Sequence, residues 1–274
     1  MKFLCRIATA LVVAAVAAGT AACDTSANTP PSPRPPGPGQ QGGPPRTMPT
    51  VQPTVGAQCK AAWAGGRQVG FLDAAAVYLG GIELGTGTKG VVLAHQANSD
   101  TCQWLPFARQ LVAAGYHVLV FDFAGSGVSG PLANGDRRDD NVVAAAAYMH
   151  GHGVMSVVLI GASMGGNASL VAATKVSPPV AGVVSLSAPV SYDGLDAGGA
   201  VRKLSVPTLY IAGSGESTYA DAARSLYAAT PGDTKKLLLG SGDQHGVALL
   251  AKAEPDAAKV RTAILDFLKA HSPV

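Results

Sequence analysis

Short apolar runs alternate with longer segments of helical pattern from about residue 66 to the end of the chain. Eight short runs predict strands, near residues 68–72, 76–84, 90–95, 117–123, 156–160, 182–186, 208–212 and 236–239. Five longer segments predict helices, near residues 104–114, 139–150, 164–176, 218–229 and 256–271. This alternation indicates a three-layer α/β protein, with a mostly parallel twisted sheet of about eight strands and helices on both faces. The first two strands predict an antiparallel hairpin at one edge of the sheet.

The segment between Ser187 and Val206 has room for a modest loop only. A lid domain needs a longer insertion than this. We therefore expect no large lid and an open site.

A Gly-x-Ser-x-Gly sequence directly follows the fifth predicted strand. The apolar residues 157–160 lead into Gly161, Ser163 and Gly165, and a small-residue helical pattern comes next. Between a strand and a helix, this sequence is typical of a nucleophile elbow, in which the serine adopts a strained backbone conformation and presents its hydroxyl. The flanking residues are glycines because a Cβ at either position would crowd the turn. Ser163 is therefore the predicted nucleophile.

A serine nucleophile needs a general base, and the base needs a carboxylate that orients it. In the chain order Ser…Asp/Glu…His, the base lies in a loop after the last strand. His245 fits this place, because it follows the last predicted strand and precedes the final helix. The acid is expected after the preceding strand, where Glu216 is the first candidate and Asp221 its rival. A carboxylate that starts a helix is the other interpretation of Glu216.

The N-terminus has the pattern of a targeting segment. Lys2 and Arg6 give a positive start, and an apolar stretch too short to span a bilayer is followed by small residues. We expect residues 1–22 to be a signal peptide. Residues 23–54 are dense in Pro and Gly and predict an extended linker, because they bury too little apolar surface to offset the entropy of ordering. The folded domain is then expected at 55–274, outside the cytoplasm.

The net charge argues against one class of partner, and the cysteines predict a disulfide. The formal net charge is +3, and removal of Lys2 and Arg6 leaves a nearly neutral chain without a basic block, which argues against nucleic acid. Cys59 and Cys102 are the cysteines that remain beyond the N-terminal region. In an oxidising compartment they predict a disulfide, with two isolated buried thiols as the alternative.

Three further motifs do not carry their usual chemistry. The Gly-x-Gly-x-x-Gly stretch at 125–130 follows a strand but is succeeded by Pro131, and the one at 85–90 precedes a strand, so neither cradles a phosphate at a helix start. His150 and His152 lie at the end of a predicted helix with no carboxylate or cysteine close by. We expect neither a metal nor an organic cofactor.

With these motifs in place, the chain from about residue 66 to 270 resembles the α/β-hydrolase superfamily, most closely its small lidless members such as dienelactone hydrolases and bacterial esterases. Besides the serine elbow and His245, the resemblance rests on a strand that ends in His95 and Gln96, where the family has His-Gly, and on Asp-x-x-Gly-x-Gly-x-Ser at 122–129. It implies an oxyanion hole formed by the backbone N–H groups of Met164 and of Gln96 or Ala97. It also implies structural roles for His95 and for the 122–129 loop.

The run Thr20–Ala21–Ala22–Cys23 similarly resembles a bacterial lipobox, with Thr20 where the family usually has Leu. It implies that Cys23 carries a lipid that anchors the protein to the cell membrane; secretion after cleavage nearby is the alternative.

Together these expectations describe a serine hydrolase that cleaves a carboxylic ester of modest size through an acyl-enzyme, with Ser163, His245 and Glu216 as its triad. An acyltransferase would have the same triad. The alternative from another class is a catalytically silent lipoprotein of the same fold that acts as a binding or scaffold module.

Overall fold

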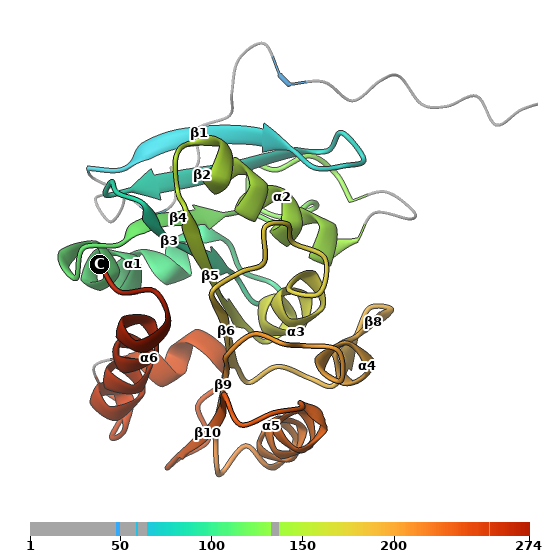
Figure 1. Cartoon of the computed structure of the whole chain (residues 1–274), viewed down its shortest axis with the longest axis vertical. Helices are drawn as coiled ribbons and strands as arrows, with labels where there is room; N and C mark the ends of the chain where they lie inside the picture. Colours follow the sequence, from blue (N-terminus) through green and yellow to red (C-terminus); the bar gives the residue numbers. More distant parts are fainter. Residues whose placement is uncertain (1–47, 50–58, 60–64, 133–136, 252) are drawn as a thin grey trace, which may run out of the picture. The chain divides into compact units, whose positions relative to one another are not determined.

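In the computed structural model, an eight-stranded sheet runs through the middle of the protein (Figure 1). Its strands lie in the order β1-β2-β4-β3-β5-β6-β9-β10. They are β1 (Arg67–Leu72), β2 (Tyr78–Leu84), β3 (Lys89–Ala94), β4 (His117–Phe121), β5 (Ser156–Ala162), β6 (Gly182–Leu186), β9 (Thr208–Gly213) and β10 (Lys235–Gly240). The β1–β2 and β2–β4 pairs are antiparallel, and the other pairs are parallel. The predicted mostly parallel sheet with an antiparallel edge hairpin is confirmed.

Helices cover both faces of this sheet, as predicted (Figure 1). Helices α1 (Leu105–Ala113) and α6 (Ala257–His271) lie on one face, and α2 (Arg138–Gly151), α3 (Met164–Ala172) and α5 (Ser217–Ala229) lie on the other. Successive strand residues point to opposite faces, so Val91 and Leu93 pack in one core while Val92 and Ala94 pack in the other. Burial on both sides explains why the central strands are continuous apolar runs.

The structure describes residues 48–49, 59, 65–132, 137–251 and 253–274. They belong to one unit that spans Pro44–Val274. The expected signal peptide (1–22), Cys23 and most of the expected linker (23–54) lie outside the described residues. Among the helices of the described part, none is both long and apolar enough to cross a membrane.

Two predicted strands are shorter in the structure, and each difference has a local cause. Strand β2 begins at Tyr78 instead of residue 76, because Asp73 accepts the N–H groups of Ala75 and Val77 and so closes a turn with Ala76 at φ +57°. Strand β4 ends at Phe121 instead of residue 123, because the Phe123 N–H donates to a side chain, Nε2 of His95, at 3.0 Å.

The segment predicted as a modest loop after Ser187 contains secondary structure of its own. It forms a small hairpin, β7 (Ser191–Tyr192) and β8 (Leu195–Asp196), followed by the short helix α4 (Ala197–Val201). Asp193 and Gly194 join the two strands with φ of +47° and +78°, the left-handed pair that tight two-residue hairpins require. No large lid is present in this segment, which confirms that part of the prediction.

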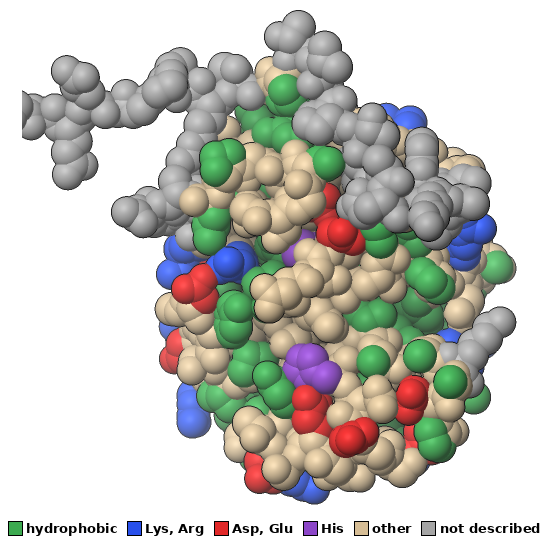
Figure 2. Space-filling view, turned by 180° about the vertical axis from the view of Figure 1, so that it is seen from behind, with side chains coloured by type: hydrophobic (Ala, Val, Ile, Leu, Met, Phe, Trp, Pro, Cys, Tyr) green, Lys and Arg blue, Asp and Glu red, His purple; other side chains and the backbone are tan. Residues whose placement is uncertain are grey.

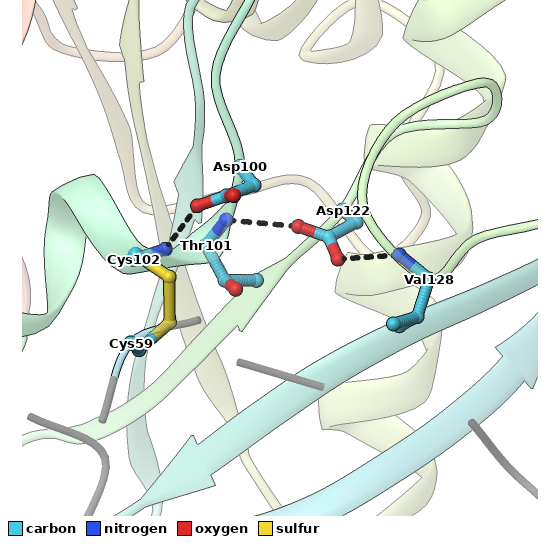
Figure 3. The surroundings of a disulfide bond; sticks show 6 residues. All are labelled: Cys59, Asp100, Thr101, Cys102, Asp122 and Val128. Carbon is cyan, nitrogen blue, oxygen red and sulfur yellow. Dashed lines mark hydrogen bonds between the residues drawn. A yellow bond between two sulfur atoms is a disulfide. The ribbon is translucent and has the colours of Figure 1, made fainter. Parts of the chain in front are cut away.

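Cys59 and Cys102 form the predicted disulfide (Figure 3). Cys102 lies in η2 (Thr101–Trp104), a 3₁₀ turn that Asp100 caps by accepting the Cys102 N–H at 2.8 Å. The adjoining Thr101 N–H donates to Asp122, whose other carboxylate oxygen accepts the Val128 N–H. The 122–129 loop is therefore held to the disulfide turn by a buried carboxylate, a structural role.

Removal of this disulfide is expected to lower the free energy of unfolding. The bond joins residues 43 apart, for which loop-closure entropy gives about 4 kcal/mol. The double variant Cys59→Ala/Cys102→Ala leaves no free thiol and should show this loss in urea unfolding. The same midpoint for both proteins under non-reducing conditions would contradict it; treatment of the wild type with reductant is the control.

Candidate active site

Ser163 lies at the sharp turn between β5 and α3. Its backbone has φ +49° and ψ −116°, a conformation that non-glycine residues rarely adopt. The turn is tight enough that a Cβ on Gly161 would lie 2.2 Å from the Gly165 carbonyl oxygen, and one on Gly165 would lie 2.3 Å from that of Ala94. Both flanking glycines are therefore required by contact. The second contact also places the end of β3 directly against the start of α3.

Glu216 and His245 meet across the loops that follow β9 and β10. Oε1 of Glu216 lies 2.6 Å from Nδ1 of His245, and the two side chains are 18% and 28% exposed. The Tyr219 ring, on the first turn of α5, lies 4.3 Å from the imidazole centroid. The two loops are also joined through backbone, because the Gly215 N–H donates to the Gly242 carbonyl at 2.7 Å. The Glu216 carboxylate and the Tyr219 ring therefore hold the His245 ring on two sides.

The two acid candidates are in different surroundings. Burial raises the pKa of Glu216, while the neighbouring His245 and the Ser187 hydroxyl partly offset this effect. Glu216 is the N-cap residue of α5, as the helix-start interpretation has it, but its side chain makes no capping hydrogen bond and contacts His245 instead. Asp221 instead pairs with Arg224 on the exposed side of α5. Only Glu216 is within hydrogen-bond distance of His245.

Ser187 connects the histidine loop to the sheet, and the sequence analysis missed this residue. It is fully buried at the end of β6, with φ +48°. Its N–H donates to the Ile211 carbonyl of β9 at 2.7 Å, and its hydroxyl accepts the Gly246 N–H at 3.1 Å. Gly246 in turn packs against Ala162, the residue before Ser163. The sequence does place Ser187, a polar residue, at the carboxyl end of a predicted parallel strand, and this position could have marked it as a candidate site residue.

Substitution Ser187→Ala is expected to lower about tenfold the ester turnover that the sequence predicts, without unfolding the protein. The buried Gly246 N–H would lose its acceptor, and an unsatisfied buried donor costs about 1–3 kcal/mol, so the loop that carries His245 would shift. The measurement is the pH profile of kcat/KM, in which displacement of His245 from Glu216 should move the acidic limb. Ser185→Ala, on the same strand, is the control. An unchanged pH profile would show that Ser187 has no positioning role.

The backbone around Ser163 also supplies free N–H donors. Met164 is the first residue of α3, where N–H groups have no acceptor inside the helix. Gln96 and Ala97 follow β3, whose end contacts Gly165, and their N–H groups have no acceptor among the described residues. The side chain of Gln96 accepts the Val247 N–H at 3.3 Å. In place of a glycine, this chain therefore uses a side chain that bridges to the histidine loop.

His95 lies beneath this loop and is fully buried. Its Nε2 accepts the Phe123 N–H at 3.0 Å, which leaves Nδ1 to donate to the Gln96 carbonyl at 2.8 Å. Burial lowers the pKa of His95 and so favours this neutral form. The contacts describe a brace for the 96–97 backbone. His150 and His152 are elsewhere, at the end of α2, with their Nδ1 atoms against backbone carbonyls.

An apolar pocket of about 410 Å³ adjoins the site. Gln96 lines it together with Phe107, Val247, Ala248 and Leu250. Because Val247 and Ala248 come just after His245, this pocket lies beside the histidine loop.

On the face drawn in Figure 2, acidic side chains gather near a histidine, and the described lysine and arginine side chains lie towards the edges.

Comparison with known proteins agrees with this architecture. Residues 90–198 match the family described as alpha/beta hydrolase fold. A 2-hydroxy-6-oxononadienedioate/2-hydroxy-6-oxononatrienedioate hydrolase of Dechloromonas aromatica is 34% identical over 92 residues, which are 32% of each chain. The chain thus matches about a third of the length of such curated relatives.

Solved structures match over a longer stretch. An esterase of Pyrococcus furiosus has a TM-score of 0.66 at 17% identity, covering 82% of this chain and 99% of its own. A monoacylglycerol lipase of Paleococcus ferrophilus has a TM-score of 0.61 at 17% identity, covering 71% and 99%. At these identities the likeness is one of fold. The chain has the α/β-hydrolase fold, which both the solved structures and the family match over residues 90–198 share.

Proposed function

We propose that this protein is a serine hydrolase that cleaves carboxylic esters of modest size. The observation that carries the proposal is the 2.6 Å contact between Glu216 and His245. Gly246, which follows His245, lies against Ala162, the residue before the strained Ser163. A carboxylate that orients an imidazole, next to a serine at a nucleophile elbow, is the constellation that activates a hydroxyl for acyl transfer. Among α/β hydrolases, the small lidless esterases are the group that this arrangement resembles most.

The proposed reaction proceeds through an acyl-enzyme. Ser163 Oγ attacks the ester carbonyl while His245 Nε2 takes its proton, and the tetrahedral intermediate then collapses as His245 protonates the departing alcohol. Water, deprotonated by His245, hydrolyses the acyl-enzyme and restores the serine. Glu216 stabilises the imidazolium in both steps. The N–H groups of Met164 and of Gln96 or Ala97 bind the oxyanion, each such donor being worth about 2.7–4 kcal/mol in related enzymes.

A panel of p-nitrophenyl esters of rising acyl length tests the proposal. We expect turnover of the short esters, falling as the acyl chain lengthens, because the pockets that adjoin the site are small, at about 410 and 280 Å³. Absence of turnover with every ester by the folded protein would contradict the proposal and favour a catalytically silent binding or scaffold module.

We also propose that the protein works outside the cytoplasm, anchored through a lipid on Cys23. The support is the lipobox-like sequence ahead of a Pro- and Gly-rich linker. Cys23→Ala is expected to move the protein from the membrane fraction to the soluble fraction, because bacterial lipoproteins rely on their acyl chains for retention. Cys5→Ala, inside the expected signal peptide, is the control. Equal membrane retention of the Cys23→Ala and wild-type proteins would rule out this anchor.

A further inference from the structure

A second pocket, of about 280 Å³, adjoins the site, and the described residues that line it include none of the histidine loop. Its lining includes Ala97, Ser99, Arg138, Met164 and Tyr192, and we call it the polar pocket. Met164 and Ala97 also belong to the proposed oxyanion hole. A group bound in the polar pocket can therefore be covalently attached to the carbonyl that the hole binds.

Arg138 brings a positive charge to this pocket from the first position of α2. Its side chain is only 18% exposed. The guanidinium lies over the Tyr192 ring, 6.0 Å from the centroid. Although burial is the main cause of the lowered pKa of His95, the charge of Arg138 lowers it further. The charge therefore acts on groups directly beneath the oxyanion loop.

The described neighbours of Arg138 leave part of its hydrogen-bonding capacity unused. Nη1 pairs with Asp193, which is itself 58% exposed on the β7–β8 turn. The Nε atom is buried and has no hydrogen-bond partner within the described part of the chain. A guanidinium has five N–H donors, and it binds a carboxylate best through two of them. Among the described residues that line the polar pocket there is no carboxylate, so a substrate carboxylate would complete this lining.

The position of the histidine loop decides which part of an ester occupies the polar pocket. His245 must protonate the departing alcohol, and the residues that follow it line the apolar pocket. The alcohol is thus expected on the apolar side. The polar pocket has no lining residue from that loop, so the acyl part lies there.

We propose that the polar pocket binds a carboxylate on the acyl part of the substrate, so that half-esters of dicarboxylic acids are the preferred substrates. This inference rests on the proposed ester hydrolysis and deepens it. Arg138 would hold the substrate carboxylate through the N–H donors that Asp193 does not use, with the Ser99 hydroxyl as an additional donor at the pocket wall.

The test compares two esters that differ by one charge, the mono-p-nitrophenyl ester of glutaric acid and its methyl-capped neutral counterpart. We expect the wild type to favour the anionic ester in kcat/KM by about 10- to 100-fold, the range of a charge-assisted hydrogen bond. Arg138→Gln should remove this preference and leave the neutral ester within about threefold. Asp193→Asn is the matched control, since it removes the competing partner and should keep or increase the preference. Thermal melts verify that all variants are folded.

A binding measurement separates this inference from the proposed function. Calorimetry with monomethyl glutarate is done in proteins that also carry Ser163→Ala, so that no turnover occurs. The protein that keeps Arg138 should bind it at least tenfold more tightly than the one with Arg138→Gln does. If neither ester is hydrolysed but this difference in binding is found, the proposed function fails and the carboxylate site stands. If both esters are hydrolysed with a preference that Arg138→Gln leaves unchanged, the carboxylate site fails and the proposed function stands. Equal binding of monomethyl glutarate by both proteins also overturns the carboxylate site.

Discussion

Replacement of Ser163 by alanine is expected to lower kcat/KM for a short ester by at least about 10⁴-fold. The members of a serine triad act as a unit, so loss of the nucleophile removes nearly all covalent catalysis and leaves only oxyanion and binding contributions. His245→Ala should cost nearly as much for the same reason. Wild-type turnover by the Ser163→Ala protein would end the interpretation as a serine hydrolase.

The fold should survive the Ser163→Ala change. The Ser163 N–H keeps its bond to the Leu186 carbonyl at 2.8 Å, which alanine also makes. Alanine carries the same Cβ into the strained backbone conformation, so the strain neither rises nor falls by much. A thermal melt within a few degrees of the wild type is the expected control, and it separates lost chemistry from lost structure.

The second large effect is expected at Glu216. Glu216→Gln should lower kcat/KM by about 10²- to 10⁴-fold, because an amide cannot stabilise the imidazolium and can hold the wrong tautomer of His245. Asp221→Asn is the matched control and should change turnover less than twofold, since Asp221 is exposed and pairs with Arg224. If Asp221→Asn were the more impaired of the two, the histidine would be served by a different acid from the one proposed.

The Glu216 carboxylate is also expected to make kcat/KM depend on pH. Burial raises the pKa of Glu216, so it takes up a proton at a higher pH than an exposed glutamate does. Protonation removes the charge that stabilises the imidazolium. In the wild type, kcat/KM should therefore fall on the acidic side, and this fall should begin above the ordinary pKa range of glutamate.

The strands and helices with a clear pattern of apolar residues could be predicted from the sequence. The strands that lead to Ser163 and Glu216 are buried on both faces, so their sequences are continuous apolar runs that differ clearly from the helical segments. The elbow was predictable because its strand, glycines and helix follow one another in the sequence. The contact that requires Gly161 is also local, with Gly165, whereas the one that requires Gly165 is with the distant Ala94.

What the sequence did not show depends on contacts between distant segments. The β7–β8 hairpin is too short for a periodic pattern, and Leu195 and Ala197 hold it through burial in the core. Arg138 contacts Tyr192 and Asp193 of this hairpin, which lie more than 50 residues further along the chain. Ser187 was passed over because its role depends on Gly246, 59 residues further along the chain.

The central claim is that Ser163 is an activated nucleophile, and a fluorophosphonate probe tests it most directly. The probe phosphonylates a serine only where a base removes its proton and an oxyanion hole is in place. We predict one adduct per folded chain, located by mass spectrometry on the peptide that contains Ser163, and none on Ser163→Ala or heat-denatured protein. A folded wild-type chain that stays unlabelled, or that is labelled at another serine while Ser163 remains unmodified, would contradict the account.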